Sequence, residues 1–423
     1  MNHLDAVVSS QKAGQLRGIT SVCSAHPFVL EAALRNSLQH DTPLLIEATC
    51  NQVNQFGGYT GMKPVDFIHF VKKAADRAGF PKEKLILGGD HLGPLVWSNE
   101  PADIAMDKAK KLVHDYALAG YGKLHLDCSM PCADDREFNV EIIAGRTAEL
   151  ARVVENTCAE AGLPLPRYVV GTEVPPAGGA KAGDEGIHTT DPAHAAETIE
   201  SIHLAFEKKG LDPAWGRVIA LVVQPGVEFG DSSIHEYDRA AAVSLTHFIE
   251  GVKGIVFEAH STDYQTREAL RQLVQDHYAI LKVGPGLTYA FREGVFALAE
   301  MEVALSVDTP SRIRETLEEA MLQNPKYWVS HYAGSPEQKK FSRVYSYSDR
   351  IRYYWALPEV TTSFNRLLIN LGKVPLPLSL VNQYLPKQYE KIRTGMLPNE
   401  PRALLLNKIT DVLDDYAFAC RIK

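Results

Sequence analysis

Short apolar runs recur along the chain up to residue 282, and a polar tip follows nearly every one of them. The runs are rich in Val, Ile and Leu and alternate little, which is typical of parallel strands buried on both faces. Stretches with helical periodicity separate them, for example 64–78, 102–119, 141–161 and 192–209. The predicted strands cover residues 18–22, 44–47, 85–87, 123–126, 168–171, 218–223, 254–257 and 279–282.

Eight strand–helix units in succession predict an α/β fold, specifically a (β/α)₈ TIM barrel. A doubly wound open sheet stays the alternative, because periodicity alone does not show closure. After Glu300 the helical pattern continues without strands, at 311–322, 360–370, 376–394 and 401–420. We therefore expect a TIM barrel at residues 1–299 and an all-helical extension at 300–423 that packs on the barrel.

Function in such a barrel is expected at the carboxyl ends of the strands. Asp90 and His91 follow the third strand in a glycine-rich turn. A carboxylate beside an imidazole can hold a metal ion with one residue and move a proton with the other. Any single polar tip could instead cap a helix or join a polar plug, but a purely structural barrel does not need so many. The other ionisable or amide tips include Asp127, Glu173, Gln224, His260 and Lys282.

Three loops suggest ligand contacts. Residues 51–61 are dense in amides and glycines, which suits sugar hydroxyls, and residues 175–186 are long and poor in apolar side chains, as a lid would be. For both, an irregular surface loop is the alternative. Gly284-Pro-Gly286 follows the eighth strand, where barrels often bind phosphate through backbone N–H groups. The residues expected to bind a substrate are Glu47, Asn51, Gln52, Gln55, Gln224, Ser261, Asp263 and Lys282.

Composition narrows the class of protein. The 423 residues are 45% hydrophobic and 23% charged, as in ordinary globular proteins. A net charge of -8 argues against nucleic acid as a general partner. No membrane span or signal peptide is recognised, and six irregularly spaced cysteines suit a reducing cytosol, so we expect a cytoplasmic protein. Cys128 and Cys132 do not form a zinc knuckle, because no second pair completes it.

Nucleotide motifs are missing from the sequence. There is no P-loop, and no Gly-x-Gly-x-x-Gly follows a predicted strand, so we expect no nucleotide cofactor. The aromatic and basic run at 345–355 is either a partner surface or a segment packed on the barrel. Arg350 or Arg352 in that run could also reach a phosphate.

Long runs of the chain resemble a known family, the non-catalytic subunit of D-tagatose-1,6-bisphosphate aldolase. The resemblance spans nearly the whole chain, and some members of the family were formerly labelled tagatose 6-phosphate kinases. It implies a role in galactitol or N-acetylgalactosamine catabolism, on a ketose or ketose phosphate, in support of a separate catalytic class II aldolase subunit. The runs that carry it are 21–27, 45–49, 51–62, 87–94, 171–175, 223–229, 258–267, 348–355 and 383–387.

The layout is also similar, more distantly, to class II aldolases themselves. Asp90 and His91 match their third-strand pair, and His260 matches a seventh-strand ligand. Gln224 stands where a sixth-strand ligand histidine is expected, and glutamine binds zinc poorly. Asp263 lies in the loop that binds phosphate in those enzymes, where a carboxylate would repel it. Both departures count against cleavage of a sugar bisphosphate by this chain alone.

Three hypotheses therefore stay open. The first is a non-catalytic partner subunit, and the least favoured is a tagatose 6-phosphate kinase. Between them stands a ketose C4 epimerase for tagatose and fructose, or an aldolase, that acts alone by retro-aldol chemistry. It would use Asp90 and Asp127 as catalytic groups and Mn²⁺, Co²⁺, Ni²⁺ or Zn²⁺ at His91, His260 and Glu173, with Gln224 or Asp127 nearby. Barrel enzymes often self-associate, so an oligomer is expected.

Overall fold

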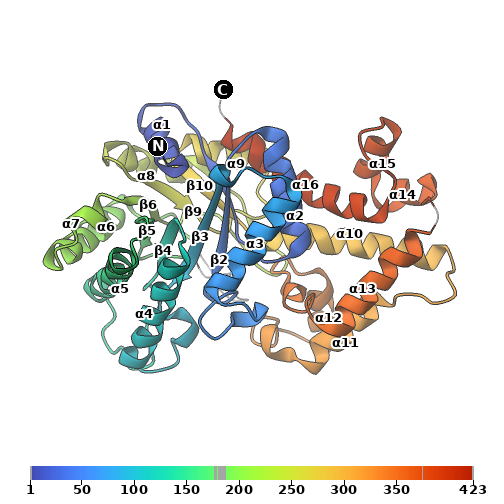
Figure 1. Cartoon of the computed structure of the whole chain (residues 1–423), viewed down its shortest axis with the longest axis horizontal. Helices are drawn as coiled ribbons and strands as arrows, with labels where there is room; N and C mark the ends of the chain where they lie inside the picture. The colour runs from blue at the N-terminus through green and yellow to red at the C-terminus, as the bar shows by residue number, and fades with distance from the viewer. Residues whose placement is uncertain (1, 176–178, 180–186, 374, 422–423) are drawn as a thin grey trace.

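A closed barrel of eight parallel strands forms the centre of the computed structural model, which describes residues 2–175, 179, 187–373 and 375–421. The strands follow one another around the barrel in chain order, which confirms the predicted TIM barrel (Figure 1). They are β1 (Ile19–Val22), β2 (Leu44–Thr49), β3 (Leu85–Leu92), β4 (Lys123–Leu126), β5 (Arg167–Gly171), β6 (Val218–Val222), β9 (Val256–Ala259) and β10 (Tyr278–Val283). A small antiparallel hairpin, β7 (Glu228–Phe229) and β8 (Ile234–His235), stands apart from the barrel sheet.

Helices surround the barrel and continue beyond it. Those up to the last barrel strand are α1 (His3–Lys12), α2 (Pro27–His40), α3 (Pro64–Ala78), α4 (Ala102–Ala119), α5 (Val140–Ala161), α6 (Pro192–Lys208), α7 (Asp212–Trp215), α8 (Arg239–Gly251) and α9 (Arg267–Gln275). The remaining helices are α10 (Pro285–Ala304), α11 (Ile313–Gln323), α12 (Pro336–Tyr345), α13 (Pro358–Leu371), α14 (Leu378–Tyr384), α15 (Pro386–Arg393) and α16 (Pro401–Cys420).

An apolar layer fills the amino-terminal half of the barrel interior. Side chains such as Ile19, Leu45 and Val169 pack there, and Leu4 and Val8 of α1 join the same cluster. The charged interior residues of β2, β3, β9 and β10, which are Glu47, Asp90, Glu258 and Lys282, lie in the carboxyl halves of their strands. The fold thus gives the barrel one polar end, which is where enzymes of this architecture place their sites.

The C-terminal helix α16 belongs to the helical ring of the barrel. It packs against α2, α9 and α10 and touches β1, while α10 runs outward to meet α13 and α14 (Figure 1). A Cβ added at Gly294 of α10 would lie 2.8 Å from Leu405 Cδ2, so α10 and α16 approach closely. Gly18 N also donates to Cys420 O. The chain's last helix therefore covers the barrel beside its first strand.

Two elements differ from the sequence expectation. The predicted helix at 376–394 is two helices, because Pro386 has no N–H to continue α14 and restricts the backbone of Leu385. Strand β3 runs to Leu92, so it includes Asp90 and His91. Among the described residues, no helix is long and apolar enough to cross a membrane.

Candidate active site

At the end of β3, two consecutive side chains point into the same cavity. In a regular strand, neighbouring side chains point to opposite faces. Here the pairing of β3 with β4 shifts between Gly89 and Leu92, and His91 has a left-handed φ of 50°. Such a backbone is unfavourable for a residue other than glycine and is concentrated at functional sites. As a result, Asp90 and His91 both line the cavity at the carboxyl end of the barrel.

Three buried imidazoles form a triangle at this end. His91, His125 and His260 come from β3, β4 and the residue after β9, and their ring centroids lie 4.9–5.2 Å apart. Each ring uses one nitrogen for a carboxylate, an arrangement that fixes the tautomer and orientation of metal-binding histidines. The pairs are His91 Nδ1 with Asp127 at 2.7 Å, His125 Nδ1 with Asp90 at 2.9 Å, and His260 Nε2 with Glu258 at 3.0 Å.

The charged groups in and around this triangle shift one another's pKa values. Burial disfavours the charged form of Asp90, but His91 and Lys282 hold its pKa well below the usual range. Burial is likewise outweighed at Asp127, where the hydrogen bond from His91 lowers the pKa. Asp90 and Asp127 in turn raise the pKa of His91 against the effect of burial. Burial and the Lys282 ammonium lower the pKa of His260 to about 3, which keeps this imidazole neutral and able to bind a metal ion.

Two buried lysines form ion pairs with the carboxylates of this site. Lys123 of β4 contacts Glu47 of β2 at 2.5 Å and Glu258 of β9 at 2.6 Å. Lys282 of β10 contacts Asp90, Glu47 at 3.1 Å and Glu258 at 3.3 Å. Despite burial, these carboxylates raise the pKa of Lys282 well above its usual value. Lys282 is thus held as an ammonium, which can donate to a ligand oxygen but is a poor amine nucleophile.

The donor set fits a divalent cation. Ligand atoms of Asp90, His125, Glu258 and His260 lie within 4.8 Å of one another, and the buried Nε2 of His125 has no hydrogen-bond partner among the residues that the structure describes. The whole cluster holds four carboxylates against two ammonium groups, so the carboxylates are in excess by two. A cation bound by imidazole and carboxylate ligands would offset that excess, and Zn²⁺, Mn²⁺, Co²⁺ and Ni²⁺ accept such ligands.

Above the charged cluster lies a cavity of about 450 Å³, a volume typical of small-molecule sites. Asp90, His91, His260 and Lys282 line one part of it, and Ser261 and Asp263 stand beside them. Apolar and aromatic side chains line the remainder, among them Phe28, Met62, Phe70, Phe291, Trp355 and Phe364.

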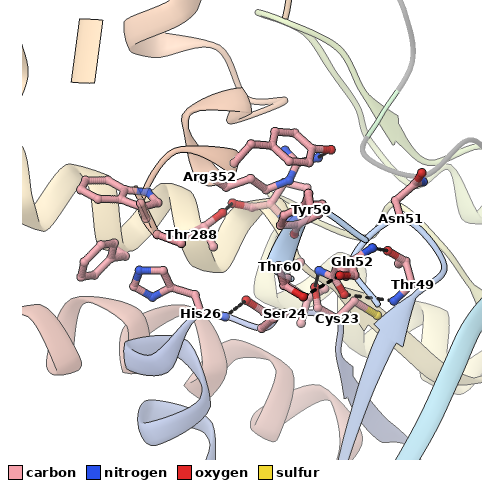
Figure 2. Close-up of a pocket in the computed structure, with 18 of the residues that line it drawn as sticks. Cys23, Ser24, His26, Thr49, Asn51, Gln52, Tyr59, Thr60, Thr288 and Arg352 are labelled. Carbon is pink, nitrogen blue, oxygen red and sulfur yellow. Dashed lines mark hydrogen bonds between the residues drawn. The ribbon is translucent and has the colours of Figure 1, made fainter. Parts of the chain in front are cut away.

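The amide-rich loop after β2 contributes a wall of this cavity, as Figure 2 shows. Gln52 donates to Cys23 O at 3.3 Å and accepts from Thr49 N at 3.0 Å, and Asn51 also lines the cavity. Gln55 instead donates to Lys108 O, and it does not line the cavity. Of the loop residues expected to bind substrate, Asn51 and Gln52 are therefore within reach of a ligand.

Other predicted site residues lie elsewhere. Glu173 and Gln224 line a second, more open hollow, where Glu173 accepts from Thr190 at 2.5 Å and lies 3.3 Å from His194. The structure does not bring either residue to His91 and His260. Glu47 is fully buried between the two lysines. The predicted lid at 175–186 falls almost wholly outside the described residues.

Sequence reasoning missed His125, Lys123 and Glu258. The sequence does indicate Lys123 and His125. They are two residues apart on β4, so their side chains lie on the same face of the strand. In a small barrel, such a polar pair faces the interior. Glu258 lies near the end of β9, but its pairing with Lys123 depends on strands that are distant in sequence.

The run at 345–355 packs against the barrel end. Arg352, Tyr353 and Trp355 line the cavity, and Tyr353 packs edge-on against Tyr59 at 4.6 Å between ring centroids (Figure 2 shows Arg352 beside Tyr59). Arg350 is buried and donates to Tyr327 O, so it is directed at the protein backbone.

The closed (β/α)₈ barrel, with a buried ionic cluster under a cavity, defines a protein of the TIM-barrel fold class. Within that class, the chain belongs to the family described as D-tagatose-1,6-bisphosphate aldolase subunit GatZ/KbaZ-like, whose model matches residues 4–421.

Several solved structures are similar to this chain. The chain is similar to a protein from Sinorhizobium meliloti 1021 described as a probable tagatose 6 phosphate kinase, at 46% identity and a TM-score of 0.89, over 96% of this chain and 100% of that one. It is also similar to the YdjI aldolase from Escherichia coli K12, at 12% identity and a TM-score of 0.42, over 89% and 98% of the two chains. The chain is similar as well to the fructose-bisphosphate aldolase from Campylobacter jejuni, at 15% identity and a TM-score of 0.46, over 87% of this chain and 92% of that one.

Proposed function

We propose that this chain itself acts on a ketose, by retro-aldol chemistry that inverts the C4 carbon of tagatose or fructose. The observation that carries the proposal is the cavity whose polar part holds Asp90, His91, His260 and Lys282. A site built only for structure would not keep paired acids, imidazoles and an ammonium open to a ligand-sized space.

The side chains of the cluster suit the steps of such a reaction. Asp90 is ionised and can take the C4 hydroxyl proton as the C3–C4 bond opens, then return it after the aldehyde fragment has turned over. The Lys282 ammonium can donate to the carbonyl oxygen on which negative charge develops. Asp127 acts as a positioning residue, because its hydrogen bond holds the His91 ring.

A divalent ion would be held by His125 and His260, together with Glu258 or the nearby His91, so that Asp90 stays available as the base. When bound, it supplies a Lewis acid for the sugar's carbonyl and hydroxyl oxygens. This ligand set replaces Glu173 of the sequence hypothesis with His125.

Turnover by the purified chain alone tests the proposal. Metal-stripped protein is supplied in turn with Mn²⁺, Co²⁺, Ni²⁺ or Zn²⁺ and with tagatose, fructose or tagatose 1,6-bisphosphate, and products are followed by carbon NMR. We expect metal-dependent interconversion of the free ketoses. Asp90→Asn should lower kcat by at least about 100-fold, because a general base is lost. The matched control Asp107→Asn, on the exposed face of α4, should leave kcat unchanged. Absence of conversion with every metal in a folded sample would overturn the proposal.

A second candidate function is support of a separate catalytic aldolase subunit, which the family description favours. Here the chain would raise the activity or lifetime of a class II tagatose-bisphosphate aldolase through its surface. If His91→Ala and His260→Ala leave that stimulation intact, the supporting role does not use the cavity. If both variants abolish it while remaining folded, the two roles share one site.

A further inference from the structure

Five aromatic rings pack together along one side of the cavity, and we call this cluster the aromatic arm. Phe291 of α10 is at its centre, and its ring centroid lies 4.2 Å from that of His26 and 4.9 Å from that of Trp355. The centroids of Phe28 and Phe364 lie 5.1 and 5.5 Å from the same ring. All five residues line the cavity, and they come from the start of α2, from α10 and from the C-terminal extension. The arm therefore forms only where the extension packs on the barrel.

The arm lies apart from the amide-rich wall of the cavity and has an opening of its own. Figure 2 shows His26 on the opposite side of the pocket from Asn51. Ala356, Thr361 and Asn365 line the cavity and are exposed, so the cavity reaches solvent near the start of α13. None of these residues belongs to the charged cluster. A small molecule can therefore reach the arm from this side.

The rings of the arm carry no net charge near neutral pH. Burial lowers the pKa of His26 to about 3, so this imidazole is neutral. Arg402 lies 4.5 Å from the ring centroid of Phe28, so one face of that ring already has a cation. An ionised ligand would lose its hydration in such surroundings without gaining an opposite charge. The arm therefore favours an uncharged ligand, and an aromatic one in particular, because aromatic rings attract one another in edge-to-face and offset arrangements.

Two buried polar atoms of the arm lack a hydrogen-bond partner among the residues that the structure describes. They are Nδ1 of His26 and Nε1 of Trp355. An indole N–H can only donate, so the partner that Trp355 lacks is an acceptor. A buried donor without a partner is unfavourable, and an acceptor oxygen on a ligand would remove that cost. Trp355 is 7% exposed and lines the cavity, which places its ring beside a bound molecule.

We propose that the aromatic arm is a second ligand site, which binds an uncharged aromatic molecule through ring contacts and through a hydrogen bond from Trp355 Nε1 to an acceptor oxygen. The site goes beyond the proposed function, because none of its groups belongs to the cluster that would act on a ketose. An occupant fills part of the same cavity, so it also narrows the space beside that cluster.

Titration of the full chain with acetophenone, toluene and benzoate tests the site without metal or ketose. Acetophenone offers a ring and an acceptor oxygen, toluene offers only the ring, and benzoate adds a negative charge. We expect acetophenone to bind about 2- to 10-fold more tightly than toluene, which is the net effect of one hydrogen bond. Benzoate should bind more weakly than acetophenone, because the arm does not compensate its charge. Ligand-observed NMR gives the three affinities.

Trp355→Phe keeps an aromatic ring in the arm and removes the donor. The variant should lose the preference for acetophenone over toluene, while its affinity for toluene stays nearly unchanged. Trp215→Phe is the matched control, because that indole stacks on His203 and does not line the cavity. The control should keep the preference of the wild type.

The indole N–H signals of the wild type provide a second readout. The chain has four tryptophans, and acetophenone should shift the Trp355 signal downfield whereas toluene should not. If Trp355→Phe does not fold, replacement of the other three tryptophans in turn assigns this signal, which then decides.

Three results would each overturn the inference: no saturable binding of acetophenone, equal affinities for benzoate and acetophenone, or an unchanged preference for acetophenone in folded Trp355→Phe. If the arm binds acetophenone as expected while the chain converts no ketose, the ligand site stands and the proposed function fails.

Discussion

At the residue scale, the chemistry of this barrel depends on how each imidazole is fixed. His91, His125 and His260 each give one nitrogen to a carboxylate, so the other nitrogen stays available within a small volume. The left-handed backbone of His91 is what admits two adjacent residues of β3 to one cavity.

His26 predicts a specific pH dependence of stability. Burial lowers the pKa of this imidazole to about 3, and its place at the N-terminus of α2 also disfavours a positive charge. Unfolded histidine titrates near 6.5, so between pH 6.5 and 3 the unfolded state binds the extra proton. The stabilisation from neutral His26 is complete above pH 6.5 and is lost as the pH falls. We expect about 2 kcal/mol of loss between pH 6.5 and 5.

Urea unfolding at pH 7, 6 and 5 measures this effect as a difference between proteins. Wild type should lose stability relative to His26→Asn as the pH falls, because the variant lacks the suppressed proton. His69→Asn, at an exposed position on α3, should follow the wild-type curve. Parallel curves for wild type and His26→Asn would show that His26 titrates normally in the folded protein.

At the element scale, buried ion pairs connect strands that are not neighbours in the sheet. Lys123 of β4 lies between Glu47 of β2 and Glu258 of β9, and all three side chains are fully buried. The strong pairing raises the pKa of Lys123 despite its burial. Removal of one partner from such a cluster leaves an uncompensated charge in a low-dielectric interior.

Lys123→Met should therefore lower the free energy of unfolding by about 3–5 kcal/mol. Denaturant titration followed by far-UV circular dichroism gives this value. Lys111→Met is the matched control, since Lys111 pairs with Asp115 at the surface and such pairs contribute about 1 kcal/mol or less. Adding Glu47→Gln to Lys123→Met should restore part of the loss. Equal stability of Lys123→Met and wild type would contradict a charged Lys123.

At the scale of the whole molecule, the barrel and the C-terminal extension share one core. Leu405 of α16 is fully buried against α10, and Tyr416 holds the loop that carries Asp263. The sequence predicts a boundary near residue 300, but α10 spans residues 285–304 and packs on both α16 and α13. We expect the two parts to unfold together.

Leu405→Ala tests that cooperativity. The cavity left by the lost side chain should lower the free energy of unfolding by about 2–5 kcal/mol. If barrel and extension unfold as one unit, fluorescence and circular dichroism will report the same shifted midpoint. Phe418→Ala, at a side chain that is 44% exposed, should shift the midpoint much less. Two separated transitions would identify the extension as an independently folding domain.

The sequence by itself determined the architecture and part of the site. Buried apolar runs and helical periods repeat locally, so the eight strands, most helices and the tips Asp90, His91, His260 and Lys282 could be placed from the residues alone. The tertiary structure decided which tips meet. Glu173 and Gln224 end strands of the same barrel yet line a different hollow, while His125 joins the cluster from within β4. Closure of the barrel, a shift in strand pairing and the return of α16 set these contacts, and each depends on segments far apart in the chain.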